Sequence, residues 1–318
     1  MKLDARSMPR RRRFMQQAAA ASLLLTAAGL CGDEPRQLLR PLTLGFSLYG
    51  MKSLEVPRAL KACRDIGYDC FELPVMADWP TDVARLTAEA RSELKRQIAD
   101  SGLRLSALME NLPLLGDEAR HRANLDRLKQ AAVLAHELAP DRPPLVETVL
   151  GGRPEQWPQV KEEMARRLRD WASVAELGKV VLAVKAHVSG ALHRPDAAVW
   201  LVNEVASEHL KLAFDYSHYW LQGLDMEDCL RAMHRETVFV HVKDAEGDAQ
   251  KFRFLLPGQG KTDYALFLRT LAIGRFPGDV VVEVSSQISS RPDYDPIAAA
   301  RSSFAVLDAA RKKLPTHL

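Results

Sequence analysis

The sequence predicts a single (β/α)8 barrel after residue 40, and three observations lead to this fold class. Eight strand-length apolar runs, rich in Val, Leu and Phe, alternate with helix-length segments. The polar residues of the second half of the chain recur at the ends of these runs, where a barrel carries its functional groups. No glycine-rich nucleotide loop follows the first run, which argues against an open doubly wound sheet.

The predicted elements follow one another in strict alternation. The predicted strands are 42–46, 69–73, 103–109, 145–149, 180–186, 210–214, 238–242 and 280–284. The predicted helices are 54–66, 82–99, 117–138, 154–177, 196–205, 226–234, 263–272 and 296–310. A long loop, 243–261, follows the seventh strand. Eight strand and helix pairs give one barrel domain, with bounds that we place at 41–313.

The charge distribution excludes a nucleic-acid binder. The chain holds 44 Lys and Arg against 41 Asp and Glu. Residues 1–31 contain six of the basic residues and one acidic residue, so the remaining chain has 38 against 40 and a net charge of about −2. A protein that binds nucleic acid normally carries its basic excess on the folded domain. No nucleic-acid partner is therefore expected.

The N-terminal stretch resembles an export signal. Arg11-Arg12-Arg13-Phe14 matches the Arg-Arg-x-Phe pattern of a twin-arginine (Tat) leader, and the apolar run 18–30 follows it. This run is too short to span a bilayer comfortably. We therefore expect a leader at 1–31, a linker at 32–40 and a periplasmic protein. A membrane-associated N-terminal helix is the alternative, and Cys31 is a candidate lipid anchor, although Leu30 stands where a small residue is preferred.

The other cysteines do not form a disulfide framework or a paired metal motif. Cys63, Cys70 and Cys229 are odd in number and widely spaced. We expect them to be small buried apolar residues.

Four successive strands direct ionisable residues to one end of the barrel. The fifth strand leads to Lys185, the sixth to Asp215, the seventh to His241 and the eighth to Glu283. Asp, His and Glu supply the oxygen and nitrogen ligands that suit Mn, Co, Zn or Mg. The set predicts a divalent metal site, and the alternative is a group of hydrogen-bonded residues that line the barrel mouth.

Further polar residues near the strand ends are candidates for contacts to substrate. Each also has an ordinary explanation, as an ion pair or a solvated side chain. These candidates are Glu72, Glu110, His187, Lys243 and Arg253.

Together, several short motifs resemble the xylose isomerase-like barrels, the sugar phosphate isomerases and epimerases. The motifs are Asp215-x-x-His218, His241-Val-Lys-Asp244, Pro257-Gly-x-Gly260 with Asp263-Tyr264, and Glu283. The resemblance implies that Asp215, His241 and Glu283 bind a divalent metal and that His218 contacts substrate or a second metal. It also implies that the Pro-Gly-x-Gly loop lies beside the substrate. Class II AP endonucleases share the fold, but they need additional His ligands on early strands, where this chain has Glu72 and Glu110.

One residue departs from the family pattern. The fifth strand of these enzymes usually ends in a metal-binding Glu, and this chain has Lys185 there. Three explanations stay open. Glu147 on the preceding strand fills the vacant ligand position, or Lys185 acts as a base or Schiff-base amine. In the third, the ammonium replaces the metal and pairs with Asp215 and Glu283.

The resemblance and the strand-end residues lead to one main hypothesis. We expect an exported enzyme that abstracts a proton next to the carbonyl of a sugar or keto-sugar, with a metal stabilising the enediolate. Glu283, Lys185 or His218 would be the base. The alternatives are a keto-sugar lyase that eliminates a group from the same site, and a non-catalytic carbohydrate-binding barrel. The expected partner is a small sugar, and the sequence leaves open whether copies form a homo-oligomer.

Overall fold

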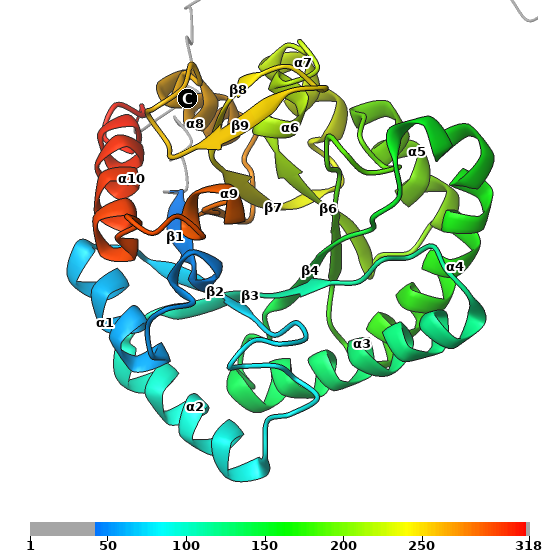
Figure 1. Ribbon diagram of the computed structural model, residues 1–318, viewed down its shortest axis with the longest axis horizontal. Coiled ribbons are helices and arrows are strands. Elements are labelled where there is room, and N and C mark those ends of the chain that lie inside the picture. The colour runs from blue at the N-terminus through cyan, green and yellow to red at the C-terminus, as the bar shows by residue number, and fades with distance from the viewer. Residues whose placement is uncertain (1–41, 316–318) are drawn as a thin grey trace, which may run out of the picture. The chain divides into compact units, whose positions relative to one another are not determined.

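The computed structural model describes residues 42–315, and they form a closed barrel of eight parallel strands inside a ring of helices (Figure 1). The leader (1–31) and the linker (32–40) lie outside the described residues. The strands pair in the order β1-β10-β7-β6-β5-β4-β3-β2. Their bounds are β1 Thr43–Ser47, β2 Cys70–Pro74, β3 Arg104–Asn111, β4 Leu145–Val149, β5 Leu182–Lys185, β6 Leu210–Asp215, β7 Thr237–Val242 and β10 Asp279–Val282.

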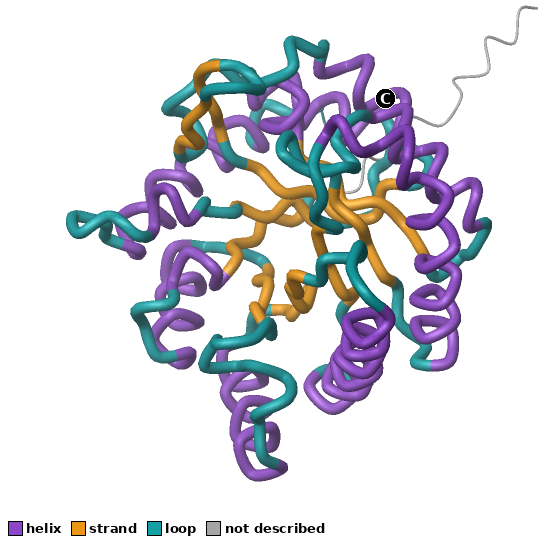
Figure 2. The backbone as a smooth tube through the Cα atoms, turned by 45° about the vertical axis from the view of Figure 1, so that its right-hand side comes forward, coloured by secondary structure: helices purple, strands orange, loops and turns teal. Residues whose placement is uncertain are grey.

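Long helices follow the barrel strands and pack outside them (Figure 2). Most begin where a side chain caps the free backbone N–H groups of the first turn, as Thr87, Asp117, Asp225, Asp263 and Asp295 do. Their bounds are α1 Val56–Ile66, α2 Ala88–Ser101, α3 Glu118–Leu138, α4 Trp157–Leu177, α5 Pro195–Val205, α7 Met226–Met233, α8 Tyr264–Ile273 and α10 Pro296–Arg311. The predicted (β/α)8 fold class is confirmed.

The apolar residues form a large cluster between barrel and helices and a small one inside the barrel. The inner cluster consists of Cys70, Ala107, Ala183, Ala213, Phe239 and Val281. Small side chains at three of these positions leave room for the Phe239 ring at the barrel centre. Cys63, Cys70 and Cys229 are buried and free, as the sequence predicts. Among residues 42–315 no helix has the length and apolar character that crossing a bilayer requires.

The structure differs from the sequence prediction in three places. Helix α2 begins at Ala88 instead of residue 82, because the preceding residues form turns and Thr87 provides the cap. The predicted loop 243–261 contains an antiparallel hairpin, β8 (Asp244–Gly247) and β9 (Phe252–Leu255). Two short helices, α6 (Tyr216–Trp220) and α9 (Ser286–Ser289), follow β6 and β10. All three lie at or near the barrel mouth, where tertiary contacts override weak local patterns.

Asp244 holds the loop that follows this hairpin. Its Oδ2 atom accepts hydrogen bonds from the backbone N–H groups of Gly258 and Gly260, each at 2.8 Å. Its Oδ1 atom accepts one from the Tyr264 hydroxyl at 3.1 Å. A Cβ atom at residue 260 would lie 2.7 Å from the Cβ of Asp244, so only glycine fits there. These three hydrogen bonds to Asp244 thus fix the conformation of the loop that leads to α8.

We expect Asp244→Ala to lower the free energy of unfolding by about 2–3 kcal/mol, because it leaves two backbone N–H groups and a buried hydroxyl without their acceptor. Urea unfolding measures this change. The control is Asp248→Ala, which removes an exposed carboxylate that caps the turn of the same hairpin. It should cost less than about 1 kcal/mol. Equal losses of unfolding free energy in the two variants would contradict this role of Asp244.

Candidate active site

The strand register brings the sequence-predicted residues together. Side chains of a strand alternate between the two faces, so a residue two positions after an inward-facing one also points inward. Ala183, Ala213, Phe239 and Val281 belong to the inner apolar cluster. The residues two positions later are Lys185, Asp215, His241 and Glu283. The four side chains therefore form a layer directly above the apolar floor of the barrel, at the carboxyl ends of the strands.

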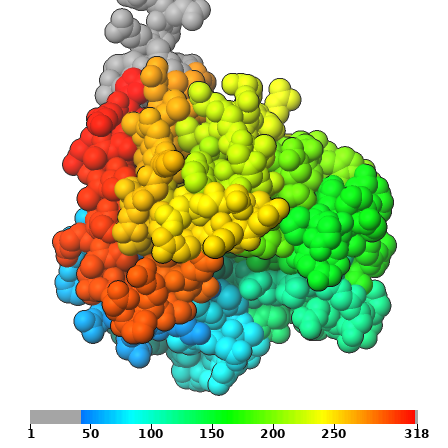
Figure 3. Space-filling view, turned by 45° about the horizontal axis from the view of Figure 1, so that its top comes forward, coloured from blue at the N-terminus to red at the C-terminus, as the bar shows by residue number. Residues whose placement is uncertain are grey.

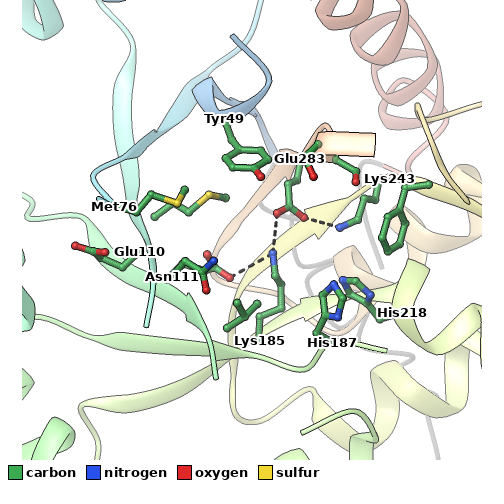
Figure 4. Close-up of a pocket in the computed structure, with 15 residues that line it drawn as sticks. Tyr49, Met76, Glu110, Asn111, Lys185, His187, His218, Lys243 and Glu283 are labelled. Carbon is green, nitrogen blue, oxygen red and sulfur yellow. Dashed lines mark hydrogen bonds and ion pairs between the residues drawn. The ribbon is translucent and has the colours of Figure 1, made fainter. Parts of the chain in front are cut away.

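A cavity of about 180 Å³ opens above this layer. Figure 3 shows the hairpin β8–β9, in yellow, above a hollow in the surface. Acidic, basic and imidazole groups line one part of the cavity, and Tyr49, Met76 and Phe254 supply apolar surface (Figure 4). Tyr49 stacks on Trp79 with ring centroids 5.1 Å apart, which fixes the orientation of its ring.

Lys185 lies at the centre of the charged layer. Its Nζ atom is 3.1 Å from Glu283 Oε1, 3.3 Å from Glu147 Oε1 and 2.7 Å from His241 Nδ1. Burial opposes the ammonium charge, but the carboxylates of Glu147 and Glu283 outweigh it and hold the pKa of Lys185 above its ordinary value. The pKa of Glu147 itself rises to about 7, because its burial outweighs the neighbouring Lys185.

Lys243 is a second buried cation in the same layer. Its Nζ atom donates to Asp215 Oδ2 and to Glu283 Oε2, and it lies 5.0 Å from the centroid of the Phe254 ring. The two lysines therefore hold the two oxygens of Glu283 from opposite sides. Burial raises the pKa of Glu283, but Lys185 and Lys243 together keep it well below its ordinary value.

His241 is fixed from both sides of its ring. The ammonium of Lys185 has no lone pair, so Nδ1 of His241 is the acceptor in their 2.7 Å contact. Nε2 then carries the proton and donates to Glu72 Oε2 at 3.0 Å. Glu72 is fully buried and orients this histidine from below the cavity, so it does not line the cavity as a substrate contact.

His187 and His218 form a neutral pair at the edge of the cavity, with ring centroids 4.2 Å apart (Figure 4). Burial and the charges of Lys243 and Lys185 lower the pKa of His187 to about 4. Burial, His187 and the same lysines place the pKa of His218 well below its usual range. Neither ring nitrogen of His218 has a hydrogen-bond partner among the described residues, although Nε2 lies 3.5 Å from Asp215 Oδ2. Both nitrogens are buried, and the His218 ring lines the cavity.

The remaining predicted residues divide between the cavity and the surface. Glu110 lines the cavity and pairs with Arg127, whose guanidinium also reaches Asp82. Burial raises the pKa of Glu110 to about 7 in spite of this pair. Arg253 is exposed and pairs with Glu246 across the hairpin, and it does not line the cavity. The substrate role predicted for Arg253 therefore has no support in the geometry.

Sequence reasoning missed the apolar part of the cavity. Tyr49 follows β1, Met76 follows β2 and Phe254 belongs to β9, so three separate segments contribute to it. Only Phe254 had a local signal, since Phe252-Arg-Phe alternates apolar and polar residues as a strand does.

Asp215, His241 and Glu283 form a possible metal site, because they offer ligand atoms that all lie within 4.8 Å of one another. The surrounding groups do not fit a divalent ion there. Every one of the three ligands already contacts the ammonium of Lys185 or Lys243. An ammonium cannot ligate a metal and repels one. The buried Glu147 is also paired with Lys185, so it does not fill the vacant ligand position.

The family model of the xylose isomerase-like TIM barrel matches residues 60–310. The chain belongs to this family. No curated protein matches the sequence. The family resemblance expected from the motifs after Lys185 is thus confirmed, and the match also covers the first half of the barrel.

Solved structures share the fold at low sequence identity. An L-ribulose 3-epimerase has a TM-score of 0.66 and 20% identity, with 86% of this chain and 96% of that chain covered. The E. coli 3-keto-D-glucoside 4-epimerase YcjR, in its apo form, has a TM-score of 0.67 and 17% identity, with 84% and 99% covered. A zinc-bound IOLI protein has a TM-score of 0.69 and 19% identity, with 85% and 96% covered.

We expect the imidazole of His187 to stay neutral down to about pH 4, whereas in the unfolded chain it should take up its proton near pH 6.5. The unfolded chain then binds more protons between these values, so the free energy of unfolding should fall as the pH drops from about 6.5 to 4. NMR titration of the His187 ring, in native protein and in urea, measures both pKa values. A native value near 6.5 would contradict the burial of this ring between the lysines and His218.

Proposed function

We propose that this protein is a sugar-modifying enzyme that abstracts a proton next to the carbonyl of a sugar or keto-sugar, in the manner of an isomerase or epimerase. Membership of the xylose isomerase-like family supports sugar chemistry. The similar structures of two sugar epimerases support it as well. The cavity at the carboxyl ends of the strands has the size and the polar groups for a small polyol.

The accessibility of Glu283 carries this proposal. Its side chain is 14% exposed and lines the cavity, whereas those of Asp215, Glu72 and Glu147 are 0%, 0% and 2% exposed. Because its pKa is held low, Glu283 is ionised and ready to accept a proton. The two lysines fix its orientation through one oxygen each.

In the proposed reaction, Glu283 removes a proton from the carbon next to the carbonyl. The electrons of the broken C–H bond form a C=C bond, and those of the C=O bond move to the carbonyl oxygen. The ammonium groups of Lys185 and Lys243 stabilise the resulting enediolate. As they shift toward this oxygen, they release Glu283, which raises its basicity as the proton arrives. The proton of the neighbouring hydroxyl group then moves to the enediolate oxygen, and the electrons of its O–H bond form the new C=O bond. The electrons of the C=C bond take the proton back from Glu283 at the former carbonyl carbon, which completes an isomerisation.

The rest of the cavity would position the sugar. The His218 ring lines the cavity and its nitrogens make no hydrogen bond to the described residues, and Glu110 and Asn111 lie on the opposite side (Figure 4). These groups suit hydroxyl groups of the substrate. Tyr49 and Phe254 suit the C–H face of a sugar ring.

A carbohydrate-binding barrel without catalysis is the second candidate. One observation favours it, because both oxygens of Glu283 are paired with a lysine, so neither oxygen of the base is free of an ion pair. The keto-sugar lyase hypothesis shares the first step, since loss of a leaving group follows the same proton abstraction. Proton exchange therefore separates both enzyme hypotheses from the binding barrel.

We expect wild-type protein in D2O to exchange the C–H proton next to the carbonyl of L-ribulose or a 3-keto-D-glucoside. Glu283→Gln should slow this exchange at least about 100-fold, because it removes the base. Proton NMR measures the exchange. Glu246→Gln, on the exposed side of the hairpin, is the matched control and should keep the wild-type rate. If both sugars bind, as a shift in melting temperature shows, and neither exchanges, the molecule is a binding barrel.

We also propose that the protein is exported to the periplasm by the leader at 1–31, because Arg11-Arg12-x-Phe14 precedes the apolar run. Replacing Arg11 and Arg12 by Lys keeps the charge but removes the arginine pair that the twin-arginine pathway recognises. We expect this double variant to accumulate in the cytoplasm, and fractionation with immunoblotting measures its location. Unchanged export of the variant would contradict a twin-arginine leader.

A further inference from the structure

We propose that Lys185 and Lys243 together take the place of the divalent cation that Asp215, His241 and Glu283 would otherwise bind. The protein would then fold and bind its ligand without a metal. This inference rests on the geometry of the charged layer, and only the catalytic role of the two lysines rests on the proposed function.

The two lysines contact the atoms that Asp215, His241 and Glu283 direct toward the possible metal site. Lys243 takes Asp215 Oδ2 and Glu283 Oε2. Lys185 takes Glu283 Oε1 and His241 Nδ1. Each ammonium thus bridges two of the three candidate ligands, as a metal ion would, and Glu283 links the two ammonium groups (Figure 4).

The second polar atom of Asp215 and that of His241 are hydrogen-bonded as well. Asp215 Oδ1 accepts hydrogen bonds from the backbone N–H and the hydroxyl of Ser217, at 3.1 and 2.6 Å. His241 Nε2 donates to Glu72. Asp215 and His241 therefore cannot turn a second atom to a metal ion without breaking a buried hydrogen bond, which is costly.

Both lysines are buried beside the site and do not extend to the bulk solvent. The side chains of Lys185 and Lys243 are each 3% exposed. The Phe254 ring lies over the Lys243 ammonium, and Glu147, which also lines the cavity, pairs with Lys185. A divalent ion entering the layer would meet two buried positive charges at close range, where repulsion is strong.

Two ammonium groups differ from one metal ion in a way that matters for a ligand. A metal gathers several ligand oxygens at one point, whereas two separate donors hold two neighbouring oxygens at separate, directed positions. The vicinal oxygens of a hydroxy-ketone match such a pair. The recognition of this group would be insensitive to chelators.

The test is the metal content and metal response of the full chain. Wild-type protein, expressed with added Mn, Co or Zn and purified without chelator, should contain well under one metal per chain. Its melting temperature should not change with MnCl2, ZnCl2 or EDTA. About one metal per chain in the wild type, lost in Asp215→Ala, would overturn the proposal.

Lys185→Glu is the informative variant, because it restores a carboxylate at the position where the family has one. We expect it to bind Mn or Zn at least about 100-fold more tightly than the wild type, as titration calorimetry measures. Lys185→Met is the matched control, since it removes the ammonium and adds no ligand, and it should bind more weakly than Lys185→Glu. If Lys185→Glu and the wild type bind the metal with equal affinity, Lys185 does not replace the metal.

The metal measurements on the wild type stand even if Lys185→Glu does not fold. They are also independent of the sugar assay. If the wild type contains no metal and does not exchange the proton, the proposed reaction is refuted, and the proposal that the lysines replace the metal still stands. If the wild type contains stoichiometric metal and exchanges the proton, the proposal that the lysines replace the metal is refuted, and the proposed reaction still stands.

Discussion

The carboxylate of Glu283, held between the ammonium groups of Lys185 and Lys243, is the interaction on which the candidate site depends. Two buried cations and their carboxylate partners are stable only as a complete set, because removal of one partner leaves a buried charge without compensation. The same two lysines also pair with other groups: Lys243 with Asp215, and Lys185 with Glu147 and His241. The geometry of the barrel mouth follows from this requirement for pairing.

The barrel provides the rigid frame that such a set requires. The four residues of the layer stand at the ends of four different strands, each two positions after a residue of the inner apolar cluster; they are Lys185, Asp215, His241 and Glu283. The parallel register fixes these ends at a common height. Above them, the hairpin β8–β9 places Phe254 over Lys243 and thereby limits access of water to the bridge. The site therefore combines a charged floor on the strand ends with walls that come from the segments after the strands.

The differences between expectation and structure arise at these walls. The sequence shows no strand or helix pattern strong enough to reveal the hairpin, and Arg253 lies beside the cavity in sequence but faces solvent in space. Glu72 ends a strand as expected, but its partner is His241 below the cavity. In each case, the direction of a side chain depends on packing against distant segments, which local periodicity does not encode.

The sequence by itself determined the barrel, its strand ends and the departure at Lys185, because these depend on the period of apolar residues and on residue identity. It also identified Asp215, His241 and Glu283 as a converging set, since parallel strands bring their carboxyl ends together. It left three roles open for Lys185. Only the tertiary structure shows which groups pair with Lys185 and that Lys243 is a second cation in the same site. That lysine follows β7 and contacts Asp215 of β6 and Glu283 after β10, the two neighbouring strands, and a contact between separate strands depends on distances that exist only in the folded chain.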